Sequence, residues 1–192
     1  ELVINFYNER RKQLLDVVPN AGHLGVADLE RDFNVTVVTQ NVDNLHERAG
    51  STHVIHLHGE LTKVCSSRDP YNPHFVKELA PEEYEVKLGD KAGDGTQLRP
   101  FIVWFGESVP EIETAIRYVE QADIFVIIGT SLNVYPAAGL LNYVPRAAEV
   151  YLIDPKPVDT HVMRPIHVIQ KGASEGVKEL KALLTATQPP LP

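Results

Sequence analysis

Side chains suited to acid–base and binding chemistry are concentrated within residues 35–59 of the sequence. Gln40, Asn41 and Asp43 follow a short β-branched run, and His58 comes directly before Gly59. A neutral imidazole is a good general base near neutral pH, and amide and carboxylate oxygens bind the hydroxyl and amide groups of a ligand. The pattern therefore predicts a ligand site with His58 as its base, although a rim histidine that bonds only to the backbone fits it equally well.

A metal site is a second interpretation of the same stretch. His56 and His58 lie two residues apart, so on a strand both project to one face, and Asp43 or Cys65 would supply a third ligand. The alternation of apolar and polar residues at 52–57 already explains a half-buried strand. The favoured interpretation is therefore a strand end without a bound metal.

The composition is that of an ordinary globular protein. Of 192 residues, 43% are hydrophobic and 23% are charged, and no apolar run approaches the roughly twenty residues of a membrane span. The net charge of -8 argues against nucleic-acid binding but is compatible with cationic, lysine-bearing substrates. The single cysteine, Cys65, excludes an intrachain disulfide and indicates a reducing compartment, for which we expect the cytoplasm. We expect neither nucleic-acid nor membrane partners.

Short apolar strands alternate with helices along most of the chain. Strands are predicted at residues 35–39, 101–105, 124–128, 150–153 and 166–169. Helices are predicted at residues 1–18, 23–32, 44–50, 110–121, 135–143 and 174–186. This alternation predicts an α/β fold, a Rossmann-like doubly wound parallel sheet, over residues 1–62 and 100–188. Residues 63–99 lack such periodicity and predict a small irregular inserted module.

Three of the predicted strands end in the polar or glycine-rich segments TQNVDN, WFGES and GTSLN. Parallel strands would bring all three segments to one edge of the sheet, where α/β proteins bind ligands. Gly129, Thr130 and Ser131 can approach a phosphate or ribose closely, but a turn of small residues is also a common structural feature. Tyr7 and Arg10 share one face of the first helix, which by itself indicates a tyrosine at the core rim and a solvated arginine.

The strings TQNVDNLHERAG, HLHGEL, WFGE and GTSLNVYPAAG, in this order and spacing, resemble the sirtuins, the NAD-dependent protein lysine deacylases. The resemblance covers about residues 2–176. It implies NAD as cofactor, acylated lysine in a protein or peptide as substrate, and nicotinamide and O-acyl-ADP-ribose as products. It also implies that His58 is the catalytic base, which activates a ribose hydroxyl after the acyl oxygen has attacked the nicotinamide-bearing carbon.

The same resemblance implies the binding residues. The implied cofactor-binding residues are Gln40, Asn41, Asp43, Gly129, Thr130, Ser131, Asp154 and Ala173. The implied substrate-binding residues are Tyr7, Arg10, Val103, Phe105, Gly106, Glu107, Asn133 and Val134. Val103 and Phe105 match the acyl-lysine tunnel, and the segments around Gly106 and Asn133 match those that hold a peptide as an added strand. Asp154 stands where the family usually has an asparagine.

The expected acyl preference rests on two residues of the first helix. Tyr7 and Arg10 match the Tyr-x-x-Arg pair of the class III branch, which favours succinyl, malonyl or glutaryl groups over acetyl. A guanidinium fork and a phenol suit a carboxylate at the end of an acyl chain, so the chemistry agrees with the resemblance.

Two departures from the family pattern matter. The family usually carries four zinc cysteines in the segment that corresponds to residues 63–99, and only Cys65 is present here, so we predict a metal-free module. The strand and phosphate loop that open the family's domain are also missing ahead of residue 1, which indicates a truncated chain. The alternative function is therefore a non-catalytic fragment that binds ADP-ribose or an acylated peptide.

Overall fold

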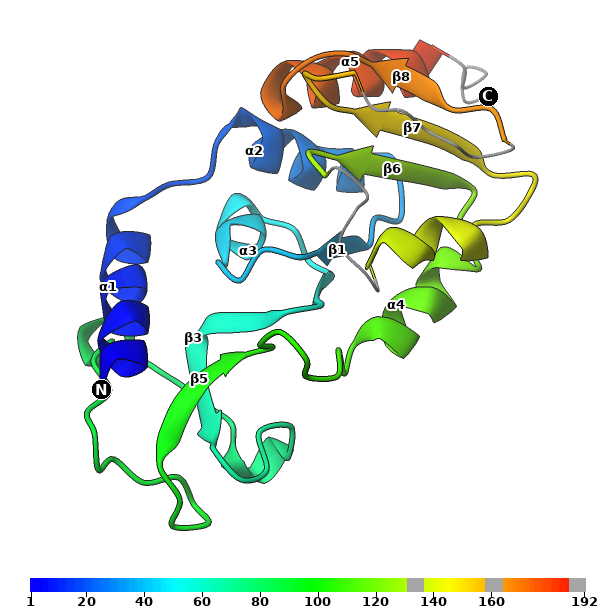
Figure 1. Cartoon of the computed structure of the whole chain (residues 1–192). Coiled ribbons are helices and arrows are strands. Elements are labelled where there is room, and N and C mark those ends of the chain that lie inside the picture. The colour runs from blue at the N-terminus through cyan, green and yellow to red at the C-terminus, as the bar shows by residue number, and fades with distance from the viewer. Residues whose placement is uncertain (131–136, 158–163, 187–192) are drawn as a thin grey trace. The chain divides into compact units, whose positions relative to one another are not determined.

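A computed structural model describes residues 1–130, 137–157 and 164–186 (Figure 1). The chain forms two compact units. The first unit comprises Glu1–Val18, Val38–Leu45 and His56–Glu111, and the second comprises Pro19–Val37, His46–Ile55 and Ile112–Pro192. Among the described residues, every helix is too short or too polar to cross a membrane.

The first unit is built on an antiparallel sheet with the strand order β4-β3-β5. Its strands are β3 (Gly59–Ser66), β4 (Lys77–Glu78) and β5 (Leu98–Ile102), and two short 3-10 turns, η2 (Pro73–Phe75) and η3 (Pro81–Glu83), lie between β3 and β5 in sequence. Helix α1 (Leu2–Asp16) packs on β3 and β5 (Figure 1). The helix buries Leu14 and Arg11, and the Arg11 Nε donates to the Leu61 carbonyl at 2.8 Å. This bond ties the helix to β3.

The strand predicted at residues 101–105 differs from the prediction in extent and direction. It runs from Leu98 to Ile102 and pairs antiparallel with β3, with Gly59 opposite Ile102 and Ser66 opposite Leu98. The prediction of a parallel strand there was wrong, because a short apolar run does not reveal the direction of its partner. The partner strand, β3, extends into the region 63–99, which lacked periodicity. Its conformation depends on pairing with β5 and not on a local sequence pattern.

The second unit holds a parallel sheet with the order β6-β7-β8. Its strands are β6 (Ile124–Ile128), β7 (Glu149–Ile153) and β8 (His167–Ile169). Its helices are α2 (Ala21–Asp28), η1 (Leu29–Arg31), α4 (Ile112–Val119), η4 (Ala137–Tyr143) and α5 (Ala173–Ala186). These strands lie within one residue of their predicted positions, and the parallel sheet with its helices confirms the α/β class.

Helix α5 packs against α2 and against strands β7 and β8 (Figure 1). The buried cluster between them consists of Val26, Leu29, Tyr151, Ile153, Ile169, Val177, Leu180 and Leu184. Glycine permits this close packing, because a Cβ at Gly176 would lie 2.2 Å from Ile153 Cγ2. Asn20 caps α2, accepting from the N–H groups of Gly22 and His23 at 2.8 and 3.1 Å, so the helix begins two residues before its predicted start.

The stretch 35–59 contains β1 (Val37–Thr39), α3 (Leu45–Ala49) and β2 (Val54–His56), and β1 pairs with β2. The Val37 N–H donates to the His53 carbonyl at 3.0 Å, and the Leu57 N–H donates to the Thr39 carbonyl at 2.9 Å. These bonds advance together along both segments, as they do in parallel strands. Gly50, with φ at +107°, follows the last residue of α3, as its position in the sequence predicts.

Candidate active site

His58 occupies the turn between β2 and β3 and is half-buried. Its Nδ1 lies 3.2 Å from the Gln40 carbonyl oxygen, which can only accept, so Nδ1 carries the proton and donates. The lone pair of Nε2 is then directed away from this bond. The His58 carbonyl accepts from the Val103 N–H at 2.9 Å, so the ring's backbone is fixed from the β5 side. The arrangement suits a general base.

Gly59 is required where it stands. Its φ is +85°, and a Cβ there would lie 2.0 Å from the Phe101 carbonyl oxygen. Only glycine adopts this conformation freely and lets β3 approach β5 so closely. The residue after the histidine thus determines how sharply the chain turns from His58 into the sheet.

The segment that follows β1 is shaped by its own side chains. The Thr39 hydroxyl accepts from the Asn41 N–H at 3.0 Å, and the Asp43 Oδ1 accepts from the Leu45 N–H at 3.0 Å. Asn41 is exposed, and Gln40 and Asp43 are half-buried. Because the Gln40 carbonyl also holds His58, the segment and the histidine are linked by a direct bond.

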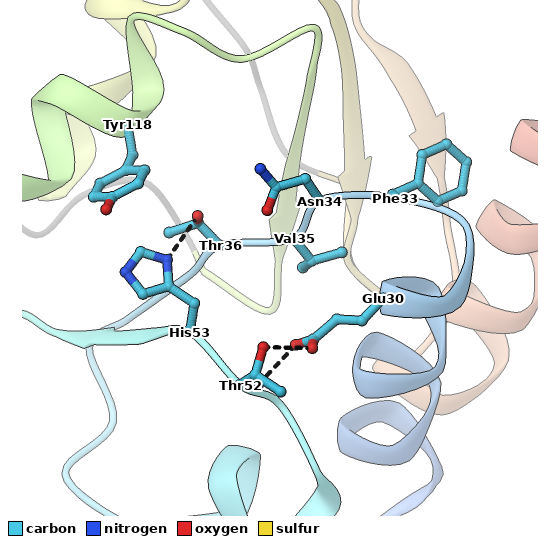
Figure 2. Close-up of a pocket in the computed structure, with 8 residues that line it drawn as sticks. All are labelled: Glu30, Phe33, Asn34, Val35, Thr36, Thr52, His53 and Tyr118. Atoms are coloured by element: carbon cyan, nitrogen blue, oxygen red, sulfur yellow. Dashed lines mark hydrogen bonds between the residues drawn. The ribbon is translucent and has the colours of Figure 1, made fainter.

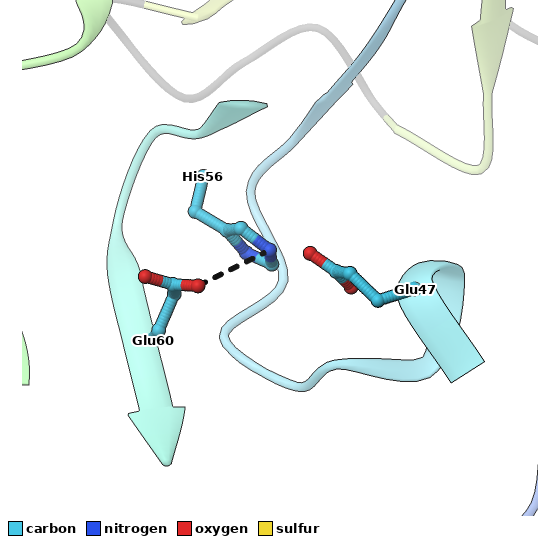
Figure 3. A group of neighbouring side chains, drawn as sticks. All are labelled: Glu47, His56 and Glu60. Atoms are coloured by element: carbon cyan, nitrogen blue, oxygen red, sulfur yellow. Dashed lines mark ion pairs between the residues drawn. The ribbon is translucent and has the colours of Figure 1, made fainter. Parts of the chain in front are cut away.

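His56 has a different environment from His58. Its Nδ1 lies 3.2 Å from the Asn41 carbonyl, and its Nε2 lies 3.9 Å from Glu60 Oε1, a pair that Figure 3 shows. Glu60 is also paired with Lys63. Cys65, the other candidate metal ligand, is fully buried, donates its thiol to the Pro100 carbonyl at 3.7 Å, and has its pKa raised to about 11 by burial.

The residues of the region 63–99 do not fit the zinc site of the sirtuins. Cys65 is the only cysteine of the sequence, and hydrogen bonds take up the side chains around it. The buried Ser66 hydroxyl donates to Asp94 Oδ2 at 2.6 Å, and Asp94 Oδ1 accepts from the Thr96 N–H and hydroxyl at 3.0 and 2.7 Å. The Ser66 and Thr96 bonds lower the pKa of Asp94 to about 2. These contacts join the end of β3 to the turn before β5.

Arg99 on β5 forms an ion pair with Glu107 in the segment that follows the strand. Arg99 Nη1 lies 2.7 Å from Glu107 Oε1 and Nη2 lies 3.0 Å from Oε2, while Nη2 also donates to the Ile102 carbonyl at 2.8 Å. Hydrogen bonding to Arg99 lowers the pKa of Glu107, so the carboxylate remains charged. Glu107 was predicted to bind substrate, and the structure places its carboxylate against Arg99.

The other predicted substrate residues of the first unit lie on α1 and in the segment after β5. Tyr7 is half-buried and its hydroxyl accepts from Trp104 Nε1 at 3.0 Å. Arg10 is exposed, with its guanidinium 5.2 Å from the Phe6 ring centroid. Val103 is half-buried, whereas Phe105 is fully exposed and Gly106 has a φ of +89°. Asn133 and Val134 lie outside the described residues.

Four predicted cofactor residues meet at the carboxyl edge of the parallel sheet in the second unit. Gly129 and Thr130 follow β6, Asp154 follows β7, and Ala173 begins α5 after β8. The Gly129 N–H donates to the Ile153 carbonyl at 3.0 Å, and the Asp154 N–H donates to the Ile169 carbonyl at 3.3 Å, so the strand ends are aligned. Such an edge is where α/β proteins bind nucleotides. Ser131, the fifth of this group, lies outside the described residues.

A separate hollow of about 380 Å³ lies elsewhere on the second unit (Figure 2). In it His53 Nδ1 lies 2.9 Å from the Thr36 hydroxyl, and the His53 ring is tilted by 58° against the Tyr118 ring with the centroids 4.7 Å apart. Glu30 accepts two bonds from Thr52. Among the residues that the structure describes, none that was predicted from the sequence to bind cofactor or substrate lines it.

Comparison with known proteins decides the family. Residues 2–136 match a family model described as the Sir2 family. The chain belongs to the Sir2 family. The sirtuin resemblance seen in the sequence motifs is thereby confirmed.

Its Sir2 relatives include an NAD-dependent protein deacylase of Bacteroides thetaiotaomicron, 84% identical over 183 residues, which cover 95% of this chain and 78% of the relative. A solved Sir2 homologue in complex with NAD superposes with a TM-score of 0.82 at 34% identity, covering 96% of this chain and 72% of that one. A Sir2 structure with a p53 peptide and NAD+ gives a TM-score of 0.72 at 27% identity, covering 91% and 74%. These Sir2 neighbours confirm the Rossmann-like fold class.

The sequence reasoning missed the residues that contact Glu107, one of the predicted substrate residues. Arg99, Trp104 and Tyr71 were not predicted to take part, yet all three contact Glu107. The Tyr71 hydroxyl lies 3.5 Å from Glu107 Oε2 and 3.2 Å from the Ser108 carbonyl. The sole tryptophan, in the string WFGE, was the available signal, but Tyr7, which accepts its indole N–H, lies 97 residues away in sequence.

Proposed function

We propose that this Sir2 chain removes acyl groups from lysine side chains of proteins with NAD as co-substrate, and that His58 is its catalytic base. Its relatives from Bacteroides thetaiotaomicron and Helicobacter pylori are named NAD-dependent protein deacylases. Sir2 neighbours are described in complex with NAD, ADP-ribose and a p53 peptide, which supports a nucleotide and a peptide as ligands. The products are nicotinamide and an O-acyl-ADP-ribose.

The observation that carries this proposal is the hydrogen bond between His58 Nδ1 and the Gln40 carbonyl. Because the carbonyl oxygen can only accept, the proton of the neutral ring lies on Nδ1. Nε2 then keeps the lone pair that a general base needs. His58 Nε2 takes the proton of a ribose hydroxyl, and the bond from Nδ1 to Gln40 stabilises the resulting imidazolium. Gln40, Asn41 and Asp43 orient the nicotinamide end of the dinucleotide.

The residues at the sheet edge of the second unit fit the adenosine end of NAD. Gly129 has a φ of +60°, and no described residue beyond its chain neighbours lies within 4 Å of the position of a Cβ, which leaves its backbone open to a ligand. The Asp154 carboxylate accepts from the Lys156 N–H at 2.8 Å through Oδ1, and its other oxygen suits a ribose hydroxyl. Ala173 opens α5 beside them. Bound NAD supplies an electrophilic ribose carbon with nicotinamide as the leaving group.

Release of nicotinamide from NAD in the presence of an acylated-lysine peptide tests the activity. The protein at its natural length releases nicotinamide in proportion to the peptide deacylated. His58→Ala reduces kcat at least about a hundredfold, because general-base catalysis contributes on this order. His74→Ala, a change at an exposed histidine of η2, is the control and keeps wild-type activity. Equal activity in both variants would refute the role of His58.

The acyl groups are succinyl, malonyl and glutaryl, with acetyl as a poorer substrate. Arg10 supports this part of the proposal because its guanidinium is exposed, lies 5.2 Å from the Phe6 ring centroid and donates a long bond of 3.4 Å to Gln13 Oε1. Such a guanidinium can pair with a carboxylate. Arg10→Met is expected to lower kcat/KM for succinyl-lysine about tenfold to a hundredfold more than for acetyl-lysine, since a charged hydrogen bond is lost. Arg68→Met, at another exposed arginine of the first unit, is the control. Equal losses for both acyl groups would contradict the preference.

A further inference from the structure

Trp104 is held from three directions in the first unit. Its backbone N–H donates to Glu107 Oε2 at 2.9 Å, the Arg99 guanidinium lies 3.6 Å from its ring centroid, and its indole N–H donates to the Tyr7 hydroxyl at 3.0 Å. The ring therefore connects the segment after β5 to helix α1. A tryptophan side chain carries one donor and no acceptor, so the direction of the bond to Tyr7 is unambiguous.

The residues that hold Trp104 are themselves fixed by several contacts. Arg99 is buried, with 8% of its surface exposed, and its two terminal nitrogens are fixed by Glu107 and by the Ile102 carbonyl. A bidentate guanidinium–carboxylate pair determines orientation as well as distance. Tyr71 adds a further contact to Glu107 from the region between β3 and β5. The indole consequently has one preferred position relative to α1.

The bond from Trp104 determines what the Tyr7 hydroxyl can do. A tyrosine hydroxyl has one proton to donate, and its oxygen here already accepts from the indole. Within the part of the chain that the structure describes, the Tyr7 hydroxyl donates no hydrogen bond. Its proton is thus available to a ligand, and an anionic oxygen is the strongest acceptor that a ligand can offer.

We propose that Trp104 is a positioning residue for acyl specificity: by donating to Tyr7 it fixes the tyrosine hydroxyl as a donor toward the carboxylate of an acidic acyl group. Arg99 and Glu107 act one step further back, since they hold the indole in place. This inference rests on the proposed preference for acidic acyl groups and names the residues that set it up. An acetyl group has no terminal carboxylate, so its removal does not depend on this bond.

Kinetics with two peptides test the role. Trp104→Phe keeps an aromatic ring beside Arg99 but removes the indole N–H. We expect it to lower the ratio of kcat/KM for succinyl-lysine to that for acetyl-lysine about fivefold, mainly through KM, because one hydrogen bond of ordinary strength is lost. Adding Trp104→Phe to the Tyr7→Phe variant should not change this ratio further. A purely structural tryptophan would lower both activities together, and that result would overturn the proposal.

The indole resonance provides a readout that does not need turnover. Trp104 is the only tryptophan, so a ¹H–¹⁵N spectrum contains a single indole N–H signal. We expect Tyr7→Phe to shift this signal and to speed its exchange with solvent, and a succinyl-lysine peptide to shift it more than an acetyl-lysine peptide does. An indole signal that responds to neither change overturns the inference, whatever the activity. A signal that responds in a protein without deacylase activity would instead refute the proposed function and retain Trp104 as a determinant of peptide binding.

Discussion

Replacing Gly59 by alanine tests whether the close approach of β3 to β5 is what requires glycine next to His58. The backbone at Gly59 has a φ of +85°, which costs a residue with a Cβ about 1–2 kcal/mol. The new Cβ would lie 2.0 Å from the Phe101 carbonyl oxygen, where ordinary contact begins at 3.4 Å, so β5 must move away. Overpacking of this kind costs about 1–3 kcal/mol more. We expect Gly59→Ala to lower the free energy of unfolding by about 2–5 kcal/mol, a large share of the roughly 5–15 kcal/mol of a typical domain.

Gly95→Ala is the matched control for this prediction. Gly95 lies in the same unit and has a φ of +77°, but nothing lies within 4 Å of the position of its Cβ, so it isolates the cost of the backbone conformation. Urea unfolding followed by fluorescence of Trp104, the only tryptophan, reports the first unit in both variants. If the two variants lose the same stability, within about 0.5 kcal/mol, the contact with Phe101 is not what requires glycine at position 59.

Three further predictions concern β3 and the region between β3 and β5. Ser66→Ala should lower the free energy of unfolding by about 1–3 kcal/mol, because the buried hydroxyl bonds to the Asp94 carboxylate and to two backbone N–H groups. Ser67→Ala, at an exposed position, is the control and should change this free energy by less than about 0.5 kcal/mol. Equal losses of the two variants in urea unfolding would contradict the prediction. The pKa of Asp94 in the folded protein is about 2, below its ordinary 3.8, so the Asp94 carboxylate contributes fully to stability above pH 3.8 and loses this contribution as the pH falls through 2. The difference in stability between wild type and Asp94→Asn should therefore shrink over that pH range. A constant difference would show that protonation of Asp94 does not affect stability. Because burial raises the pKa of the Cys65 thiol to about 11, alkylation of the folded protein at pH 8 should be at least about a hundredfold slower than in denaturant, and comparable rates would show that the thiol is accessible.

Much of the second unit could be predicted from periodicity. Strand β6 was predicted with its observed bounds, and β7 and β8 within one residue, because continuous apolar runs between polar turns are typical of buried parallel strands. Periodicity predicted that the segments TQNVDN, WFGES and GTSLN would share one sheet edge, but the strand before WFGES pairs antiparallel in another sheet. Gly129, Asp154 and Ala173, which the family resemblance named, lie at the ends of β6 and β7 and at the start of α5. Local sequence was informative here because each strand is short, apolar and bounded by its own turns.

The first unit was harder to predict because distant residues define it. The antiparallel pairing of β3 with β5 places Gly59 opposite Ile102, and the local pattern of neither strand reveals that direction. The prediction of parallel strands therefore failed for β5. The irregular appearance of residues 63–99 has the same origin, since side-chain hydrogen bonds such as that of Ser66 to Asp94 leave no periodic signal.

The residues of the stretch 35–59 were predicted as a site from sequence alone, because His58, Gly59 and the polar group from Gln40 to Asp43 have types and spacing suited to that chemistry. The tertiary structure decided what these residues contact. It shows that Gln40 presents its carbonyl to His58 Nδ1, that Gly59 is needed because Phe101 lies against it, and that Trp104 reaches Tyr7 from 97 positions away. Local sequence reveals which residue types are present and how they are spaced. Which nitrogen of a histidine carries the proton, and how closely two strands approach, depend on the distant segments that the fold brings into contact.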